Sequence, residues 1–389
     1  MHIAIIDSIC DPAQPGVGGL SDINWRLAHE LVNAGDVVTI IGPYHKDVAV
    51  PYPNIQVIEV PKAVIRNNNI IKSVLRTVRL AHAAKQLHRV DVYHVPDSIT
   101  AGFVSLWGLG SRVVWHGHTN VYYYSRNGIP YDMSTYILML AATKYASQKV
   151  SHVVTLGPSM IPWWQKSGFS RDRIRVIPNA VDMPTSDSRD EAAKWDEVAI
   201  AWKKNTYHLL YVGRLAPDKG GQLELIDAIA KLHAEIPVGL AIAGDGPLRN
   251  QIEKTIQNRN LTNVVTCVGH QPPEILSYAY RGADLVVLPS QAEMLPRVML
   301  EAWAAGAPFM ANAVGAIPDY LKDGDNGYLL NSLQPDYLRL RLRDVLRDPV
   351  QRAQVATRGK AFAQEMSWPR MATEFREIYH TVVANSRRR

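Results

Sequence analysis

The stretch that decides the fold of this chain reads SQAEMLPRVMLE, from Ser290 to Glu301. It sets two carboxylates, Glu293 and Glu301, on either side of Pro296. Proline suits the first turn of a helix, where its missing N–H group costs nothing. The pattern therefore predicts a helix over residues 298–305, with Gly306 ending it.

In this arrangement Glu293 lies on the loop that enters the helix, and Glu301 lies more than one turn inside it. Between them, the first free backbone N–H groups of the helix point outward with the positive end of its dipole. Such a site can hold a sugar joined to a phosphate, with Glu293 on the hexose hydroxyls and Glu301 on those of a ribose. On the spacing alone, two solvated glutamates are the alternative.

A second motif, GRLAPDK, runs from Gly213 to Lys219 between an expected strand and an expected helix. This place lets Arg214 and Lys219 reach the carboxyl edge of a parallel sheet, where ligands bind in such folds. A guanidinium and an ammonium together neutralise a diphosphate and stabilise the charge that develops as it leaves. A pair of surface cations is the alternative.

A third motif, Gly244-Asp245-Gly246, ends another expected strand. Its glycines permit a tight turn that lets a ligand ring approach the backbone, although a plain strand-to-helix turn would need the same residues. Downstream, residues 314–319 read VGAIPD.

Composition limits the class of protein. The chain has 389 residues, 47% of them hydrophobic, which suits two globular domains. It has two cysteines without metal-ligand spacing and a first strand that begins at Ile3, so we expect a reduced, cytoplasmic setting. No apolar run reaches the length of a membrane span. The net charge of +6 favours an acidic partner.

Apolar stretches alternate with helical patterns through the first half, and the alternation restarts after residue 190. This pattern is typical of parallel sheets covered on both faces. We therefore predict an α/β protein with two Rossmann-like, doubly wound domains that face each other across a cleft. The first covers residues 1–183 and the second residues 184–367.

Taken in order, the three motifs and VGAIPD resemble the nucleotide-sugar half of retaining glycosyltransferases with the GT-B fold, the large family that includes sucrose synthases and bacterial mannosyltransferases. The resemblance implies a last helix, over residues 368–389, that crosses back to the first domain. It implies donor contacts from Gly213, Gly244, Asp245 and the turn Met294-Leu295-Pro296. In this family, Gly-Phe usually stands where this chain has Met294-Leu295, which leaves the identity of the sugar open.

The resemblance extends into the first domain. The loop at Gly18 and Gly19 resembles the glycine-rich loop whose amides approach the donor phosphates and the acceptor; a flexible turn is the alternative. His118, in the run VVWHGH, matches the family's active-site histidine, where a neutral imidazole bonds the transferred sugar or orients the acceptor. His116 shares a face with it on an extended chain, so one of the two is expected to be structural.

Two further clusters have open interpretations. Tyr122, Tyr123 and Tyr124, with Tyr131 and Tyr136, form either a platform for sugar or lipid or part of the core. The stretch Lys62–Arg89 holds seven cations and no acidic residue before Asp91, with apolar residues on one expected helical face. It predicts either contact with an anionic membrane or an ordinary helix that packs on the sheet.

The sequence therefore predicts a retaining, metal-independent hexosyltransferase without a cofactor. It would take its sugar from a nucleotide diphosphate sugar and pass it to a hydroxyl of a glycan or lipid-linked acceptor, at the cytoplasmic face of the membrane. Retention would follow the family's front-face attack, in which the leaving phosphate takes the acceptor's proton. The alternatives are a nucleotide-sugar epimerase on the same fold and a non-catalytic sugar-nucleotide or membrane-binding module. Nucleic acid is not an expected partner, because no recognition module is visible.

Overall fold

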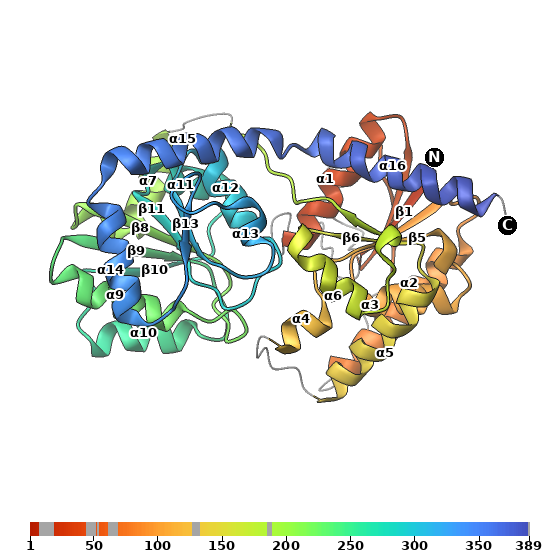
Figure 1. Cartoon of the computed structure of the whole chain (residues 1–389), viewed down its shortest axis with the longest axis horizontal. Coiled ribbons are helices and arrows are strands. Elements are labelled where there is room, and N and C mark those ends of the chain that lie inside the picture. Colours follow the sequence, from red (N-terminus) through yellow and green to blue (C-terminus); the bar gives the residue numbers. More distant parts are fainter. Residues whose placement is uncertain are drawn as a thin grey trace. The chain divides into compact units, whose positions relative to one another are not determined.

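The computed structural model describes residues 1–7, 19–43, 52, 54–60, 69–126, 133–184 and 189–387. Contacts divide the chain into two units, which are Met1–Ala180 with Trp368–Arg389, and Val181–Ser367. The predicted boundary, between residues 183 and 184, falls close to this division. Each unit is a parallel sheet with helices on both of its faces, so the predicted fold class is confirmed (Figure 1).

The described strands of the first unit lie in the order β3-β2-β1-β4-β5-β6-β7, and every pair is parallel. Helices α1 and α16 cover one face, and α2, α3 and α5 cover the other (Figure 1). The strands are β1 (His2–Ile6), β2 (Val37–Gly42), β3 (Gln56–Glu59), β4 (Val92–Val95), β5 (Val113–His116), β6 (His152–Thr155) and β7 (Ile174–Val176). The helices are α1 (Gly19–Asn33), α2 (Asn69–Gln86), α3 (Ser98–Leu106), α4 (Val121–Arg126), α5 (Met133–Lys149), α6 (Ile161–Lys166) and α16 (Trp368–Ser386).

The sheet of the second unit has the order β10-β9-β8-β11-β12-β13 and is also parallel throughout. Its strands are β8 (Tyr207–Val212), β9 (Val238–Ala243), β10 (Val265–Gly269), β11 (Leu285–Leu288), β12 (Phe309–Asn312) and β13 (Tyr328–Leu330). Its helices are α7 (Arg189–Val198), α8 (Ile200–Lys203), α9 (Gln222–His233), α10 (Arg249–Asn258), α11 (Pro273–Gly282), α12 (Arg297–Ala305), α13 (Ile317–Tyr320), α14 (Pro335–Leu346) and α15 (Pro349–Glu365).

Burial on both faces explains the composition of the strands. All of Ile3–Ile6 in β1 is inaccessible to solvent, and so is nearly all of Val238–Ala243 in β9. A parallel sheet with helices on both sides requires such continuous apolar runs rather than alternation. This is why the central strands could be predicted from short hydrophobic stretches.

Helix α16 returns from the end of the second unit to the core of the first, as predicted. It packs beside α1 (Figure 1) and buries Phe375 and Tyr379 completely. Arg376 Nε also donates to a carboxylate oxygen of Asp36, in the turn before β2, at 2.8 Å. The C-terminal segment is therefore an integral part of the first unit.

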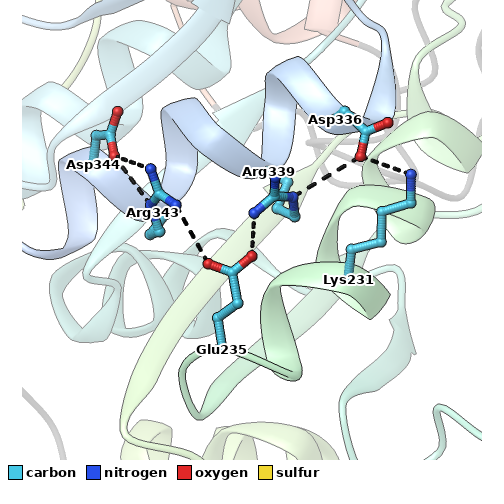
Figure 2. A network of polar contacts seen from close by, with 6 residues as sticks. All are labelled: Lys231, Glu235, Asp336, Arg339, Arg343 and Asp344. Atoms are coloured by element: carbon cyan, nitrogen blue, oxygen red, sulfur yellow. Dashed lines mark hydrogen bonds and ion pairs between the residues drawn. The ribbon is translucent and has the colours of Figure 1, made fainter.

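A surface network of ion pairs joins α9 to α14 in the second unit (Figure 2). Glu235, just after α9, contacts Arg339 and Arg343 of α14. Lys231 Nζ donates to a carboxylate oxygen of Asp336 at 2.8 Å. Exposed pairs of this kind contribute about 0–1 kcal/mol each. Lys231 is therefore a surface cation whose carboxylate partner lies within this network.

Candidate functional site

The strand order of the second unit reverses between β8 and β11. From β8 the chain proceeds outward to β9 and β10, and from β11 it proceeds the other way to β12 and β13. In open α/β sheets, ligands bind outside the carboxyl ends of the strands at such a switch point. The loops that leave β8 and β11 hold seven of the predicted residues, which are Gly213, Arg214, Lys219, Glu293, Met294, Leu295 and Pro296.

These two loops are in direct contact. Gly221 has φ +81°, and a Cβ atom built on it would lie 1.9 Å from the carbonyl oxygen of Pro289. The backbone N–H of Gln291 donates to the carbonyl of Lys219 at 2.6 Å. Only a glycine allows this approach, so the second glycine after the Lys219 motif sets the position of the loop that carries Glu293.

A side-chain ion pair across the switch point joins two predicted site residues. Lys219 Nζ lies 2.8 Å from Glu293 Oε2, and their side chains are 23% and 10% exposed. Both residues were predicted to contact the ligand, but their pairing with each other was not predicted. The pair places an ammonium and a carboxylate side by side, where one can face a phosphate and the other a hydroxyl.

Arg214 has a different environment. Its guanidinium pairs with Asp218, one turn later in the same loop, and its side chain is 56% exposed. Asp218 was not among the predicted site residues, although the i,i+4 spacing to Arg214 was a signal for this pair. Arg214 is therefore at the edge of the site and already partly neutralised.

The loops after β8 and β9 also touch through their glycines. A Cβ atom on Gly244 would lie 1.9 Å from the carbonyl oxygen of Gly213. Asp245, which follows, accepts a hydrogen bond from the Gly246 N–H at 2.7 Å and pairs with Arg249 at 3.0 Å. These bonds lower the pKa of the Asp245 carboxyl, first through the Gly246 N–H. Asp245 thus stabilises its own turn. This role was not predicted, because Asp245 was expected only to contact the donor.

The helix after β11 begins one residue earlier than predicted, and its proline precedes the first turn instead of lying within it. Pro296 is the N-cap, with extended ψ of 130°, and α12 starts at Arg297. The predicted end is correct, because Gly306 adopts the left-handed conformation with φ +79°. The side chains of Met294 and Leu295 are buried, so a ligand could meet this turn only through its backbone. The Met294 carbonyl already accepts the Ala316 N–H at 2.7 Å.

Glu301 is held by two partners that the sequence analysis missed. The hydroxyl of Tyr280, from α11, donates to Glu301 Oε2 at 2.9 Å. Arg297, one turn earlier in α12, lies 3.3 Å from Glu301 Oε1. Burial raises the pKa of Tyr280 well above its usual value, so its hydroxyl remains a donor. The spacing of Arg297 was visible in the sequence, but the contact with Tyr280 depends on the packing of two helices.

In the first unit, Gly19 is the first residue of α1, and Gly18 lies outside the described residues. His118 follows the carboxyl end of β5, is 8% exposed, and contacts His116 with ring centroids 3.8 Å apart and ring planes tilted by 48°. The prediction that these two histidines share a face is confirmed. Burial, the larger cause, and electrostatic repulsion from His94, the smaller one, lower the pKa of His118 to about 3. Its imidazole is therefore neutral at pH 7.

The two open clusters also have definite positions. Tyr123 is buried and packs edge-on against Trp163, whereas Tyr122 is half-buried beneath the ammonium of Lys166, 5.5 Å from its ring centroid. The cluster is thus partly core. Tyr136 is half-buried on α5, and Tyr131 lies outside the described residues.

Helix α2 carries the described part of the basic stretch, whereas Lys62 and Arg66 lie outside the described residues. The expected apolar face of this helix includes Val74, Leu75 and Val78; Leu75 is 38% exposed and the two valines are half-buried, so this face is not fully packed in the core. The buried face consists instead of Thr77, Leu80, Ala81 and Ala84. Helix α2 packs against the neighbouring helix α3.

Two kinds of feature are absent from the described residues. None of their helices combines the length and the apolar character needed to cross a bilayer. Within the same ranges, no three His, Cys, Asp or Glu side chains gather in a way that could hold a metal ion. The predicted absence of a metal remains a prediction.

Comparison with known proteins agrees with this geometry. The model of the glycosyl transferases group 1 family matches residues 195–362, and that of Glycosyltransferase Family 4 matches residues 17–183. Together they include both units, and the chain belongs to the family 4-like glycosyltransferases with the GT-B fold.

Curated relatives include D-inositol 3-phosphate glycosyltransferases from Segniliparus rotundus and Paenarthrobacter aurescens. The first is 30% identical over 50% of this chain and 44% of the relative, and the second is 30% identical over 56% and 54%. The chain thus spans about half the length of the curated relatives it matches.

Solved structures share the fold over nearly the whole chain. Sucrose-phosphate synthase from Thermosynechococcus elongatus has a TM-score of 0.81 at 21% identity, covering 99% of this chain and 100% of that one. Anabaena HepE in complex with UDP and glucose has a TM-score of 0.75 at 20% identity, covering 97% and 98%.

Proposed function

We propose that this protein is a retaining, metal-independent glycosyltransferase that moves a hexose from a nucleotide diphosphate sugar to a hydroxyl group. The observation that carries the proposal is the Lys219–Glu293 pair at the switch point of the second unit, 2.8 Å apart. An ammonium beside a carboxylate fits the junction between a phosphate and a sugar. The presence of UDP in the HepE structure supports a nucleotide donor.

The proposed roles follow from position. Lys219 and Arg214 neutralise the diphosphate, and Glu293 accepts hydrogen bonds from the hexose hydroxyls. Glu301 accepts them from the ribose. The backbone of Gly213, Gly244 and Asp245 lies against the nucleoside, and that of Met294, Leu295 and Pro296 against the sugar phosphate. His118, with Gly18 and Gly19, belongs to the site in the first unit, where its neutral imidazole bonds the transferred sugar or orients the acceptor.

The proposed reaction needs no covalent enzyme intermediate. The acceptor oxygen bonds to the anomeric carbon on the same face from which the diphosphate leaves, so the configuration is retained. The electron pair of the broken C–O bond goes to the diphosphate, and the acceptor's proton goes to a phosphate oxygen. Lys219 stabilises the charge that develops on the leaving group.

A donor screen tests the proposal. The protein is incubated with UDP-, GDP- and ADP-linked hexoses in the presence of EDTA, and nucleoside diphosphate release and the thermal midpoint are followed. We expect one donor to raise the midpoint and to be consumed when a hydroxyl acceptor is supplied. NMR of the product's anomeric carbon checks retention. Binding without release under any acceptor would favour the binding module, and interconversion of the sugar would favour the epimerase.

A first prediction concerns Tyr280. Changing it to phenylalanine removes the hydroxyl that holds Glu301 and leaves the ring in place. We expect the KM for the donor to rise about three- to tenfold, since one hydrogen bond contributes about 0.5–1.5 kcal/mol. Initial-rate kinetics measure it. Tyr278→Phe, two residues earlier in α11, is the control and should leave KM unchanged; equal effects of the two variants would contradict the role of Tyr280.

We also propose that the acceptor is a lipid-linked or membrane-surface glycan, reached by peripheral binding through α2. The supporting features are the exposed Leu75 and the cations Arg76 and Arg79 on a helix without acidic residues. This arrangement suits an anionic lipid surface.

Neutralising Arg76 and Arg79 together, each to glutamine, tests the membrane proposal. We expect binding to phosphatidylglycerol vesicles at low salt to weaken about 30-fold, because each cation near the surface contributes about 1 kcal/mol. Vesicle sedimentation measures it. Arg171→Gln with Arg175→Gln makes the same change of charge elsewhere in the first unit. If both double variants bind alike, α2 is not the membrane contact.

A further inference from the structure

Three histidines lie together in the interior of the first unit, at the carboxyl ends of β4 and β5. The ring centroids of His94 and His116 are 5.2 Å apart, and those of His116 and His118 are 3.8 Å apart. His94 and His116 are completely buried. The three imidazoles therefore form a continuous row that ends at His118.

Helix α16 closes the other end of this row. The hydroxyl of Tyr379 and Nδ1 of His94 share a hydrogen bond of 2.7 Å. The ring of Phe375 packs on both inner histidines, with centroid distances of 5.1 Å to His94 and 4.9 Å to His116. Through these contacts, a helix from the far end of the sequence reaches the residue proposed to meet the substrate.

Packing alone does not account for imidazoles in this place. Among the described residues, neither ring nitrogen of His116 has a hydrogen-bond partner, and both are buried. The same is true of Nε2 in His94 and in His118. A buried polar atom without a partner lowers stability, and an apolar ring of the same size would avoid this loss. Proteins break such local rules mainly at functional sites.

We propose that Tyr379 is a positioning residue for His118. Its hydroxyl selects one tautomer of His94 and fixes the plane of that ring. The rings of His94 and Phe375 then hold His116, and His116 holds the imidazole of His118 at the angle that it presents to the substrate. The inference rests on the proposed function, which gives His118 its role in the site.

The electrostatics of the row agree with control by orientation rather than by charge. Burial lowers the pKa of His94 to about 3 and that of His116 well below its usual value. The row is therefore neutral at pH 7, and each ring has one donor and one acceptor nitrogen. In a neutral ring, the tautomer and the plane decide which nitrogen faces a ligand. The Tyr379 hydroxyl sets both in His94, and the packing of the row passes the constraint on the ring plane to His118.

Tyr379→Phe removes only the hydroxyl and tests the proposal. With the intact chain and the donor found in the screen, we expect kcat to fall about three- to tenfold, the range set by one hydrogen bond, while the donor KM stays unchanged. The ¹⁵N spectrum of the His118 imidazole should change, because the plane of that ring is no longer held. This spectrum needs no substrate, so it reports on the contact independently of activity.

Tyr93→Phe is the matched control. Tyr93 precedes His94 in β4, so its side chain lies on the opposite face of the strand. It is buried, and its hydroxyl donates to the carbonyl of Ala84 at 3.3 Å. This variant also loses one buried hydroxyl from the same strand region, so it should match Tyr379→Phe in stability and resemble the wild type in kcat and in the His118 spectrum.

The outcomes separate the two proposals. Wild-type kcat and an unchanged His118 spectrum in Tyr379→Phe would overturn the positioning role. Full turnover by His118→Ala would instead overturn the site assigned to His118 under the proposed function. A second variant, His94→Phe, removes the link while filling the space, and it must reproduce the shift in the His118 spectrum if the row transmits the effect.

Discussion

Replacing Lys219 by methionine is expected to lower kcat by about 10²- to 10³-fold, the loss typical of removing one group that stabilises the charge of a transition state. Methionine keeps the length and the apolar stem of lysine and removes only the ammonium. The Lys219 ammonium lies 2.8 Å from Glu293, on a loop that Gly221 presses against the loop leaving β11. It is therefore held in place before any substrate arrives.

The size of this effect depends on burial. The Lys219 side chain is 23% exposed, compared with 56% for Arg214, which already pairs with Asp218. A cation in a partly water-excluded site stabilises developing charge far more than one in solvent. We therefore expect the corresponding change at Arg214 to have the smaller effect of the two.

Lys231→Met is the control for Lys219→Met. Lys231 also pairs with a carboxylate at 2.8 Å, but it belongs to the surface network between α9 and α14 (Figure 2). Steady-state kinetics with the donor from the screen should show wild-type kcat for Lys231→Met. A Lys219 variant with kcat within twofold of the wild type would remove the cation from the proposed chemistry.

The fold could be predicted from the sequence because its signals are local. Apolar runs at the right lengths marked the central strands, and the αL glycine Gly306 marked the end of α12. The return of α16 to the first unit has no such local signal. It was predicted only from the resemblance to a family, because the histidines that Phe375 contacts lie more than 250 positions earlier in the sequence.

The candidate site could be predicted only in outline. The motifs identified Lys219, Glu293 and Glu301, since Lys219 and Glu293 lie in loops that follow strands and Glu301 lies in the helix after the second of these loops. Their partners depend on packing between elements that are distant in sequence, as with Tyr280 on Glu301. His94 was missed for the same reason. A histidine within an apolar strand does not show which helix will cover it. Its place among apolar residues did indicate that the side chain would be buried.

Gly221→Ala is the second change with a large expected effect. At φ +81°, an L-residue is strained by about 1–2 kcal/mol. In addition, the new Cβ atom would lie 1.9 Å from the carbonyl oxygen of Pro289, so the backbone of one loop must move. We expect the free energy of unfolding to fall by about 3 kcal/mol or more, within the range of severe backbone substitutions. Urea unfolding of the whole chain, followed by tryptophan fluorescence, measures this loss.

Gly324→Ala separates the two contributions. Gly324 has a similar φ of +74° in the same unit, but its Cβ atom would have its nearest neighbour at 4.0 Å, on the flexible side chain of Gln351. The free energy of unfolding of this variant should fall only by the cost of the strained backbone conformation, and its donor affinity should not change. In Gly221→Ala, by contrast, the displaced loop separates Lys219 from Glu293, so we expect the dissociation constant for the donor to rise at least about tenfold, as the loss of one charged contact would cause. Equal losses of stability in the two variants, with equal donor affinity, would mean that the contact between the two loops does not hold the site together.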